Sequence, residues 1–282
     1  MRLIPIIALI ALAQGCSPSP TPASTAPAAA PGATDPAPQS VSLEDWTWTE
    51  LRDAIGGGTT TIILPVGGVE QSGPFVALGK HDARVKVLAD RIARNLGRTL
   101  VAPVIAYVPE GSIDPPTEHM RFPGTITVPS DIFRQTLESA AMSLRAHGFT
   151  DIVLIGDHGG YQDDLKAVAE DLNRRWAGTP ARAHFIASYY RATQTSFVAA
   201  LKRRGFSEAE IGTHAGLADT SLLMATAPGM VRADRLGKGE PPGPALGVHG
   251  DPSRSSAALG QLGVEAIVAE TTAAIRAELK PR

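Results

Sequence analysis

Two apolar runs far apart in the chain each end in glycines beside a residue that can bind a metal ion. The run at 60–66 leads into GGVEQSGP, which contains Glu70, and the run at 151–155 leads into GDHGG, which contains His158. Short apolar runs bounded by turn residues predict buried strands. Open α/β sheets bind ligands in the crevice beyond the carboxyl ends of their strands. We therefore expect Glu70 and His158 to face one crevice.

Helical and strand patterns alternate along the chain. The capping-box spacing of Thr47 and Glu50 predicts a short helix that ends at the glycines 56–58. The remaining predicted elements are, in chain order, a helix at 82–96, a strand at 99–103, a helix that Ser130 caps and that runs to 147, a helix at 165–176, a strand at 183–188 and a helix at 219–225. This alternation predicts a three-layer α/β/α fold with a mostly parallel sheet covered by helices on both faces.

Length and composition limit the classes of protein. The 282 residues, 43% of them hydrophobic, suffice for one sizeable core. No internal repeat is visible, and we expect one folded domain at 41–282. The net charge of −2 gives no reason to expect nucleic acid or an anionic surface as a partner.

The first 16 residues have the pattern of a bacterial export signal. Arg2 precedes an apolar stretch at 3–13 that is too short to span a bilayer, and Cys16 follows AQG, which is similar to a lipoprotein cleavage box apart from its alanine. Residues 17–40 are almost all Ser, Pro, Thr, Ala and Gly, which predicts an extended tether. We expect a periplasm-facing domain that a lipid on Cys16 anchors to a bacterial membrane. The alternative is a plain secretory signal with an incidental cysteine, the only cysteine of the chain.

Three segments together resemble the creatininase (creatinine amidohydrolase) family of metal-dependent amide hydrolases. The segment 67–77 resembles the family's G-x-x-E-Q-H-G-P-H-x-P, the segment 156–161 resembles N-G-H-G-G-N or N-G-H-Y-E-N, and the segment THAGLADTS at 213–221 resembles H-A-G-x-x-E-T-S. The likeness covers about 43–275 and implies the family's α/β/α fold for the folded domain. Because fold does not imply function, the activity has to be argued from the site residues.

The resemblance implies a metal site built on Glu70 and His158. In the family an Asp stands eleven positions after the motif Glu, a place that His81 holds here with Asp82 beside it. We expect one of these two as the third ligand. The family's carboxylate chemistry favours Asp82, whereas the alignment without gaps favours His81, which is the expected ligand because Asp82 would need a one-residue insertion. Neighbouring residues in extended chain point to opposite sides, so only one of them is expected to reach the metal.

Two changes in the motifs bear on the number of metal ions. Ser72 stands in place of the first motif His, and Gly160 stands in place of a Glu that some members carry. A second metal position has therefore lost its own ligands, so we expect one divalent ion, zinc or manganese. Three protein ligands and a water are enough for a catalytic zinc. The alternative is that Glu70 and His158 only form hydrogen bonds in the crevice.

The third segment supplies the expected catalytic residues. The resemblance implies that His214 moves a proton, a role that suits imidazole, with Asp219 in the place of the motif Glu. The alternative is a His214 that only caps or packs before the helix. Ser72, Tyr161 and His119, which belongs to a segment similar to the family's H-x-x-F-P-G-T, are expected to line the substrate pocket.

These features predict a metal-dependent hydrolase that acts on an amide or cyclic amide C–N bond of a small molecule. Creatinine itself is not the expected substrate, because the changed ligand positions reshape the pocket. The alternatives are a non-catalytic descendant of the same fold that binds a small ligand, and a purely structural lipoprotein. The resemblance also implies a homo-oligomer, since family members are often hexamers.

Overall fold

Four parallel strands form one sheet in the order β2-β1-β3-β4. The strands are β1 (Thr61–Val66), β2 (Thr99–Val101), β3 (Asp151–Gly156) and β4 (Arg182–Phe185). The two central strands pair in register from Thr61 with Asp151 to Val66 with Gly156, so β1 and β3 end at the same level. This confirms the predicted parallel sheet and brings the two glycine-rich segments together at one edge.

The structure is a computed structural model that describes residues 40–238 and 242–279, all within the unit Ala37–Arg282. The signal peptide and lipid anchor predicted at 1–16 lie outside these residues, as does the predicted tether at 17–40 apart from Ser40. Within the described ranges, no helix is both long enough and apolar enough to cross a bilayer.

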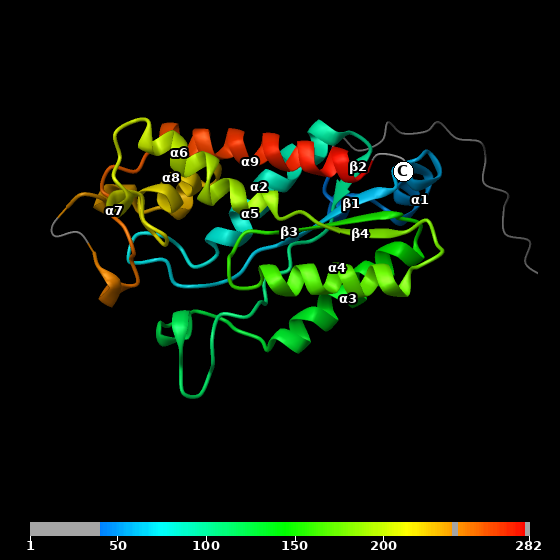
Figure 1. Ribbon diagram of the computed structural model, residues 1–282, viewed down its shortest axis with the longest axis horizontal. Coiled ribbons are helices and arrows are strands. Elements are labelled where there is room, and N and C mark those ends of the chain that lie inside the picture. The colour runs from blue at the N-terminus through cyan, green and yellow to red at the C-terminus, as the bar shows by residue number, and fades with distance from the viewer. Residues whose placement is uncertain (1–39, 239–241, 280–282) are drawn as a thin grey trace, which may run out of the picture. The chain divides into compact units, whose positions relative to one another are not determined.

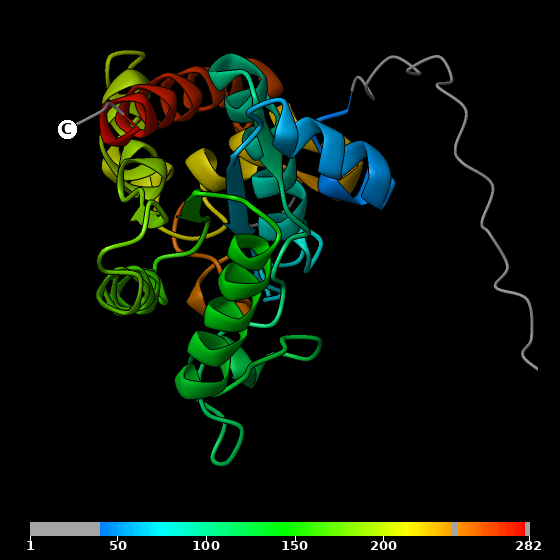
Figure 2. The same cartoon turned by 90° about the vertical axis from the view of Figure 1, so that its right-hand side faces the viewer.

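Helices cover both faces of the sheet (Figures 1 and 2). One face carries α1 (Trp48–Gly56), α3 (Ser130–Ala146) and α4 (Gln162–Arg175). The other face carries α2 (Lys80–Leu96), α5 (Ser188–Gln194), α6 (Ser196–Lys202), α7 (Glu208–Ile211), α8 (Leu217–Thr226) and α9 (Ala257–Glu278). The short 3₁₀ helices of the described residues are η1 (Leu43–Asp45), η2 (Glu118–Arg121), η3 (Pro228–Met230), η4 (Ala233–Arg235) and η5 (Pro244–Leu246). The predicted three-layer α/β/α arrangement is confirmed.

Alternate side chains of the central strands enter two hydrophobic cores. Ile62 and Leu64 of β1 pack in the core on the α3–α4 side, whereas Ile63 between them packs in the core on the α2 side. Strand β3 shows the same alternation. A strand that is buried on both faces needs apolar residues at every position, which explains why the two runs are continuous rather than alternating.

Two helix starts test the capping predictions. Thr47 accepts a hydrogen bond from the amide of Glu50, and the Glu50 carboxylate accepts one from the amide of Thr47, so the predicted capping box is confirmed. The prediction that Ser130 caps its helix is wrong. Ser130 is the first helical residue, and Pro129 holds the cap position without a side-chain hydrogen bond.

Helix α2 begins at Lys80, two residues earlier than predicted. His81 and Asp82 therefore lie in the first helical turn, and the argument that treated them as extended chain is wrong; the helix sets their directions. The start of α2 comes very close to the end of β1, because a Cβ on Gly67 would lie 2.0 Å from Asp82 Oδ1 and 2.9 Å from Asp82 Cα. Only glycine at position 67 permits this approach.

Candidate metal centre

Two glutamates and two histidines converge beyond the ends of β1 and β3. In the part of the chain that the structure describes, the ligand atoms of Glu70, Glu110, His119 and His158 lie within 4.8 Å of one another. Glu70 follows β1 and His158 follows β3, whereas Glu110 lies in the loop after β2 and His119 lies in η2. Both glutamates are buried and both histidines are half-buried. We call these four residues the ligand group.

The carboxylate of Glu70 has two different sides. Its Oε1 lies 2.8 Å from His81 Nε2 and 3.2 Å from Lys80 Nζ. Its Oε2 lies 3.0 Å from His119 Nε2 and 3.4 Å from His158 Nε2 but accepts no hydrogen bond. The Glu70 side chain is fully buried, so an oxygen without a partner costs free energy unless a cation compensates its charge.

Glu110 adds two more buried carboxylate oxygens without a hydrogen bond. Burial, and then the neighbouring Glu70 carboxylate, raise the pKa of Glu110 to about 9. Burial lowers the pKa of His158 to about 4, which favours the neutral imidazole that metal ions bind. When a cation displaces the proton of Glu110, carboxylate oxygens beside neutral imidazoles form a donor set that fits a divalent ion.

The two predicted alternatives for the third ligand lie outside the ligand group. His81 directs both ring nitrogens at carboxylates, with Nε2 2.8 Å from Glu70 Oε1 and Nδ1 2.7 Å from Asp157 Oδ2. Asp82 accepts a hydrogen bond of 2.9 Å from the amide of Gly68. The structure thus places His81 where it orients Glu70, and Asp82 where it holds the turn after β1.

The sequence predicts His119 at the pocket, whereas no motif in it singles out Glu110. Glu110 stands in a long loop rich in Pro and Gly, outside the motifs that support the family resemblance. The only feature of the sequence that points to Glu110 as a metal ligand is its place in the same loop as His119. That signal is weak, because acidic residues in loops are usually solvated.

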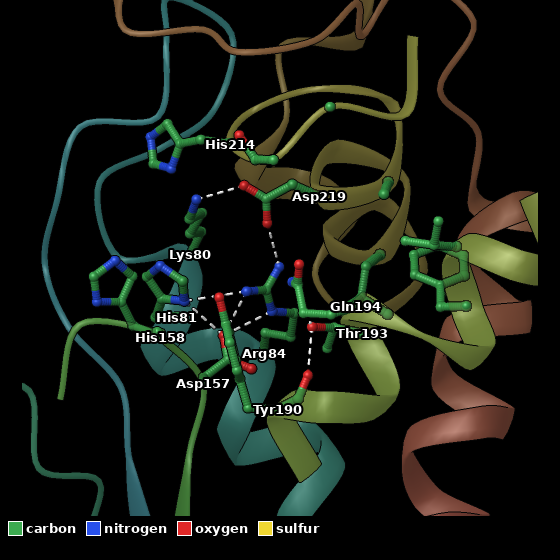
Figure 3. A pocket seen from close by; sticks show the side chains of 17 residues that line it. Lys80, His81, Arg84, Asp157, His158, Tyr190, Thr193, Gln194, His214 and Asp219 are labelled. Atoms are coloured by element: carbon green, nitrogen blue, oxygen red, sulfur yellow. Dashed lines mark hydrogen bonds and ion pairs between the residues drawn. The ribbon is translucent and has the colours of Figure 1, made fainter. Parts of the chain in front are cut away.

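A network of charged side chains adjoins Glu70 through Lys80. Figure 3 shows its members Lys80, Arg84, Asp157 and Asp219. Lys80 Nζ lies 2.5 Å from Asp219 Oδ2, and Arg84 Nη1 lies 2.6 Å from Asp219 Oδ1. The Arg84 Nε–H group also donates to Asp157 Oδ2 at 2.7 Å. Although burial acts to lower it, the carboxylates of Asp219 and Glu70 raise the pKa of Lys80, so its ammonium stays charged.

His214 lies against the ligand group. Its ring centroid is 4.6 Å from that of His119, and its Nδ1 is 3.6 Å from Glu70 Oε1. Its Nε2 lies 3.0 Å from the backbone oxygen of Gln71, a contact that fixes the ring. Burial, and then the charge of Lys80, lower the pKa of His214 to about 3, so the imidazole is neutral at pH 7 and is a weak base in this environment.

Asp219 supports the turn that carries His214. Its Oδ2 accepts a hydrogen bond of 2.9 Å from the amide of Ala215, a residue with a left-handed φ of 53°. A left-handed backbone is costly for a residue with a Cβ, so this contact stabilises the turn. Because its two oxygens also bind Lys80 and Arg84, Asp219 is placed to position neighbours rather than to exchange protons.

Tyr161 is fully buried and links the two strand ends. Its hydroxyl accepts hydrogen bonds of 3.0 Å from the amides of Asp157 and His158. The same hydroxyl lies 2.9 Å and 2.7 Å from the carbonyl oxygens of Val66 and Gly67, and it can donate its single proton to one of them. Tyr161 was predicted to bind substrate, and the structure gives it a bracing position instead.

A cavity of about 120 Å³ adjoins the ligand group. Its wall combines charged, imidazole and apolar side chains, among them Lys80, His158, His214, Phe197 and Leu222. Ser72 does not lie on this wall, and its buried hydroxyl has no hydrogen-bond partner among the described residues. His119 lines a second hollow together with Gln71 and Arg121. The ligand group therefore lies between two hollows.

The sequence model of the creatininase family, described as creatinine amidohydrolase, matches residues 44–275. The chain belongs to the creatininase family. A creatinine amidohydrolase from Pseudomonas putida is 27% identical over 263 residues, which cover 86% of this chain and 99% of that relative. A mycofactocin precursor peptide peptidase from Mycolicibacterium smegmatis is 26% identical over 222 residues, which cover 71% of this chain and 78% of that relative.

Solved structures of creatininase share the fold. A mutant creatininase superposes with a TM-score of 0.74 at 25% identity, covering 86% of this chain and 100% of the other. A manganese form of creatininase has a TM-score of 0.69 at 24% identity, with the same coverage of 86% and 100%. These likenesses confirm the predicted fold, and the match to the family model confirms the predicted family.

Proposed function

We propose that this protein is a metal-dependent hydrolase that cleaves an amide or cyclic amide C–N bond of a small molecule. The observation that carries the proposal is the ligand group. Three buried carboxylate oxygens of Glu70 and Glu110 lack hydrogen bonds and lie with two histidines beside a small cavity. The family membership supports the same chemistry, because one relative is a creatinine amidohydrolase and another is a peptide peptidase.

The four side chains of the ligand group would hold one divalent ion, zinc or manganese. When bound, such an ion polarises a carbonyl oxygen and lowers the pKa of a water molecule. His81 keeps the Glu70 carboxylate in one orientation through its contact at 2.8 Å. Orientation by a neighbouring side chain of this kind strengthens a metal site.

His214 is the proposed acid and base. Its Nδ1, which lies 3.6 Å from Glu70 Oε1, would take up a proton from the attacking water and pass it to the leaving nitrogen. Asp219 and Gln71 would act as positioning residues, since they hold the turn and the ring of His214.

The cavity favours a small substrate with a neutral polar group. Its volume of about 120 Å³ is close to the roughly 150 Å³ that holds a benzene molecule, so a group of about six heavy atoms fits. The charges on its wall are already paired, Lys80 with Asp219 and Arg84 with Asp157. A substrate that carries its own charge would therefore find no free partner on that wall.

Location and assembly are proposed on the sequence alone. Cys16 follows a short apolar stretch and precedes a tether rich in proline, which supports a lipid-anchored domain facing the periplasm. The family resemblance supports a homo-oligomer such as a hexamer.

Metal analysis and a hydrolysis screen against small amides test the function together. Purified protein should contain zinc or manganese and hydrolyse at least one amide. His158→Ala should lose the metal and the activity. His214→Gln should keep the metal and lose turnover by about 10²- to 10⁴-fold. His147→Ala, an exposed histidine after α3, is the matched control and should change neither. Protein without metal refutes the proposal, and a metal without hydrolysis favours the alternative of a small-ligand binder.

A further inference from the structure

Lys80 is the most deeply placed cation next to the ligand group. Its side chain is 1% exposed, and its Nζ lies 2.5 Å from Asp219 Oδ2 and 3.2 Å from Glu70 Oε1. Lysine is almost never fully buried unless it is paired, because an ammonium that leaves water loses favourable hydration. Here two carboxylates from different parts of the chain compensate that cost.

The position of Nζ relative to Glu70 is specific. Lys80 and His81 both approach Oε1 of Glu70, whereas the two histidines of the ligand group approach Oε2. Glu70 therefore has one oxygen that faces an ammonium and one oxygen without a hydrogen bond. A carboxylate can bridge two cations in this way when each of its oxygens faces one of them.

The surroundings of Nζ are themselves ligands of a kind that divalent ions use. They comprise Oε1 of Glu70, Oδ2 of Asp219 and the imidazole of His214, whose Nδ1 is 3.6 Å from the same Glu70 oxygen. Two carboxylates and an imidazole would suit zinc or manganese if the ammonium were absent. Figure 3 shows Lys80 reaching between His214 and Asp219.

We propose that the Lys80 ammonium occupies a second cation position of this centre, so that Glu70 is shared between a divalent ion at Oε2 and Lys80 at Oε1. The inference rests on the proposed function in one respect, namely that the ligand group binds a metal. It adds the reason why the centre takes a single ion. A covalently attached ammonium cannot be released, so it excludes a second ion and supplies one positive charge in its place.

The rival explanation is a salt bridge with Asp219 that only stabilises the fold. The two explanations predict different results for a variant that lacks the charge. If Lys80 occupies a cation position, Lys80→Met removes the ammonium between the Glu70 and Asp219 carboxylates, which keep His81 and Arg84 as their charged neighbours, and a second divalent ion should enter. If Lys80 is merely structural, the variant loses stability but still binds one ion.

The number of metal ions bound per chain distinguishes the cation-position explanation from the purely structural one. Wild-type protein, Lys80→Met and the control Lys86→Met would be saturated with zinc, freed of excess metal and analysed for zinc per chain. Lys86 lies on the same helix and its side chain is 64% exposed. We expect about one ion for the wild type and for Lys86→Met, and about two for Lys80→Met. A manganese-loaded Lys80→Met sample should also show the electron paramagnetic resonance signal of two coupled ions.

The measured numbers of ions per chain test the inference and the proposed function separately. One ion in Lys80→Met, bound with wild-type affinity, overturns the inference and leaves the proposed function intact. Two ions in the wild-type protein also overturn it, and that measurement does not depend on whether the variant folds. No metal in the wild type overturns the proposed function and the inference with it.

Discussion

His81 of α2 places its Nε2 2.8 Å from Oε1 of Glu70, the glutamate that follows strand β1. Its other ring nitrogen lies 2.7 Å from Asp157 Oδ2, beyond the end of β3. One histidine at the start of a helix thus links the carboxylates that follow the two central strands. The contact places His81, which the sequence offered as a third metal ligand, where its ring orients the Glu70 carboxylate.

The first prediction separates an orienting role from a ligand role. His81→Ala should weaken metal binding by about 10- to 100-fold, the usual effect of removing a side chain that orients a ligand. His119→Ala should weaken it more, because it removes a member of the ligand group. Competition of each variant with a chromophoric chelator measures both affinities. The opposite ranking would show that His81 is the third ligand, as the alignment without gaps predicted.

The sheet could be predicted because its signals are local. The continuous apolar runs of β1 and β3, with turn residues at their ends, specify buried parallel strands, and their ends then fall together by register. Glu70 and His158 come directly after these strand ends. It was therefore predictable from the sequence that Glu70 and His158 lie close together. In the structure, Glu70 Oε2 lies 3.4 Å from His158 Nε2.

The rest of the site depends on contacts that no periodic pattern encodes. Glu110 and His119 come from one long loop whose path is set by hydrogen bonds to distant segments, such as that from the Gln71 amide to the Thr125 hydroxyl at 3.1 Å. The start of α2 at Lys80 likewise has no side-chain cap to mark it, since Gly79 holds the cap position. Prediction failed at the points where tertiary contacts, rather than local propensity, decide the conformation.

The second prediction concerns the stability that the metal-free protein loses because the Glu110 side chain is buried. Glu110→Gln should raise the thermal unfolding temperature of chelator-treated protein, because an amide removes a buried acidic group within 4.8 Å of Glu70 and can donate to it. The same variant should lose the stabilisation that metal gives the wild type. That stabilisation is about 2.7 kcal/mol when the free metal exceeds its Kd a hundredfold.

A control substitution of another glutamate in the same protein is needed for this comparison. Glu138→Gln, on α3, changes a carboxylate that pairs with Arg175 at 2.8 Å and does not belong to the ligand group. It should leave the shift induced by metal unchanged. An equal response to metal in Glu110→Gln and in the wild type would exclude Glu110 from the ligand set.

The third prediction addresses the anchor. Cys16→Ser should release the protein from bacterial membranes into the soluble fraction, because the buried acyl chains that hold a lipoprotein would be missing. Membrane fractionation with detection of the chain measures the change, and wild-type protein extracted by detergent is the reference. If the variant stays with the membranes, Cys16 carries no anchoring lipid.

The last prediction concerns Tyr161, whose hydroxyl joins the ends of β1 and β3. Tyr161→Phe should lower the free energy of unfolding by about 1–3 kcal/mol, because the loss of the hydroxyl leaves the His158 amide without an acceptor and leaves the Asp157 amide only the Val66 carbonyl. Tyr107→Phe is the matched control, since that ring is 62% exposed and its substitution should change the free energy by no more than about 0.5 kcal/mol. Urea unfolding of both variants measures the difference.

The affinity for metal should fall as well in Tyr161→Phe, because the His158 amide is one of the groups that the hydroxyl holds. Equal stability of the two variants would mean that the strand ends are fixed by the sheet alone.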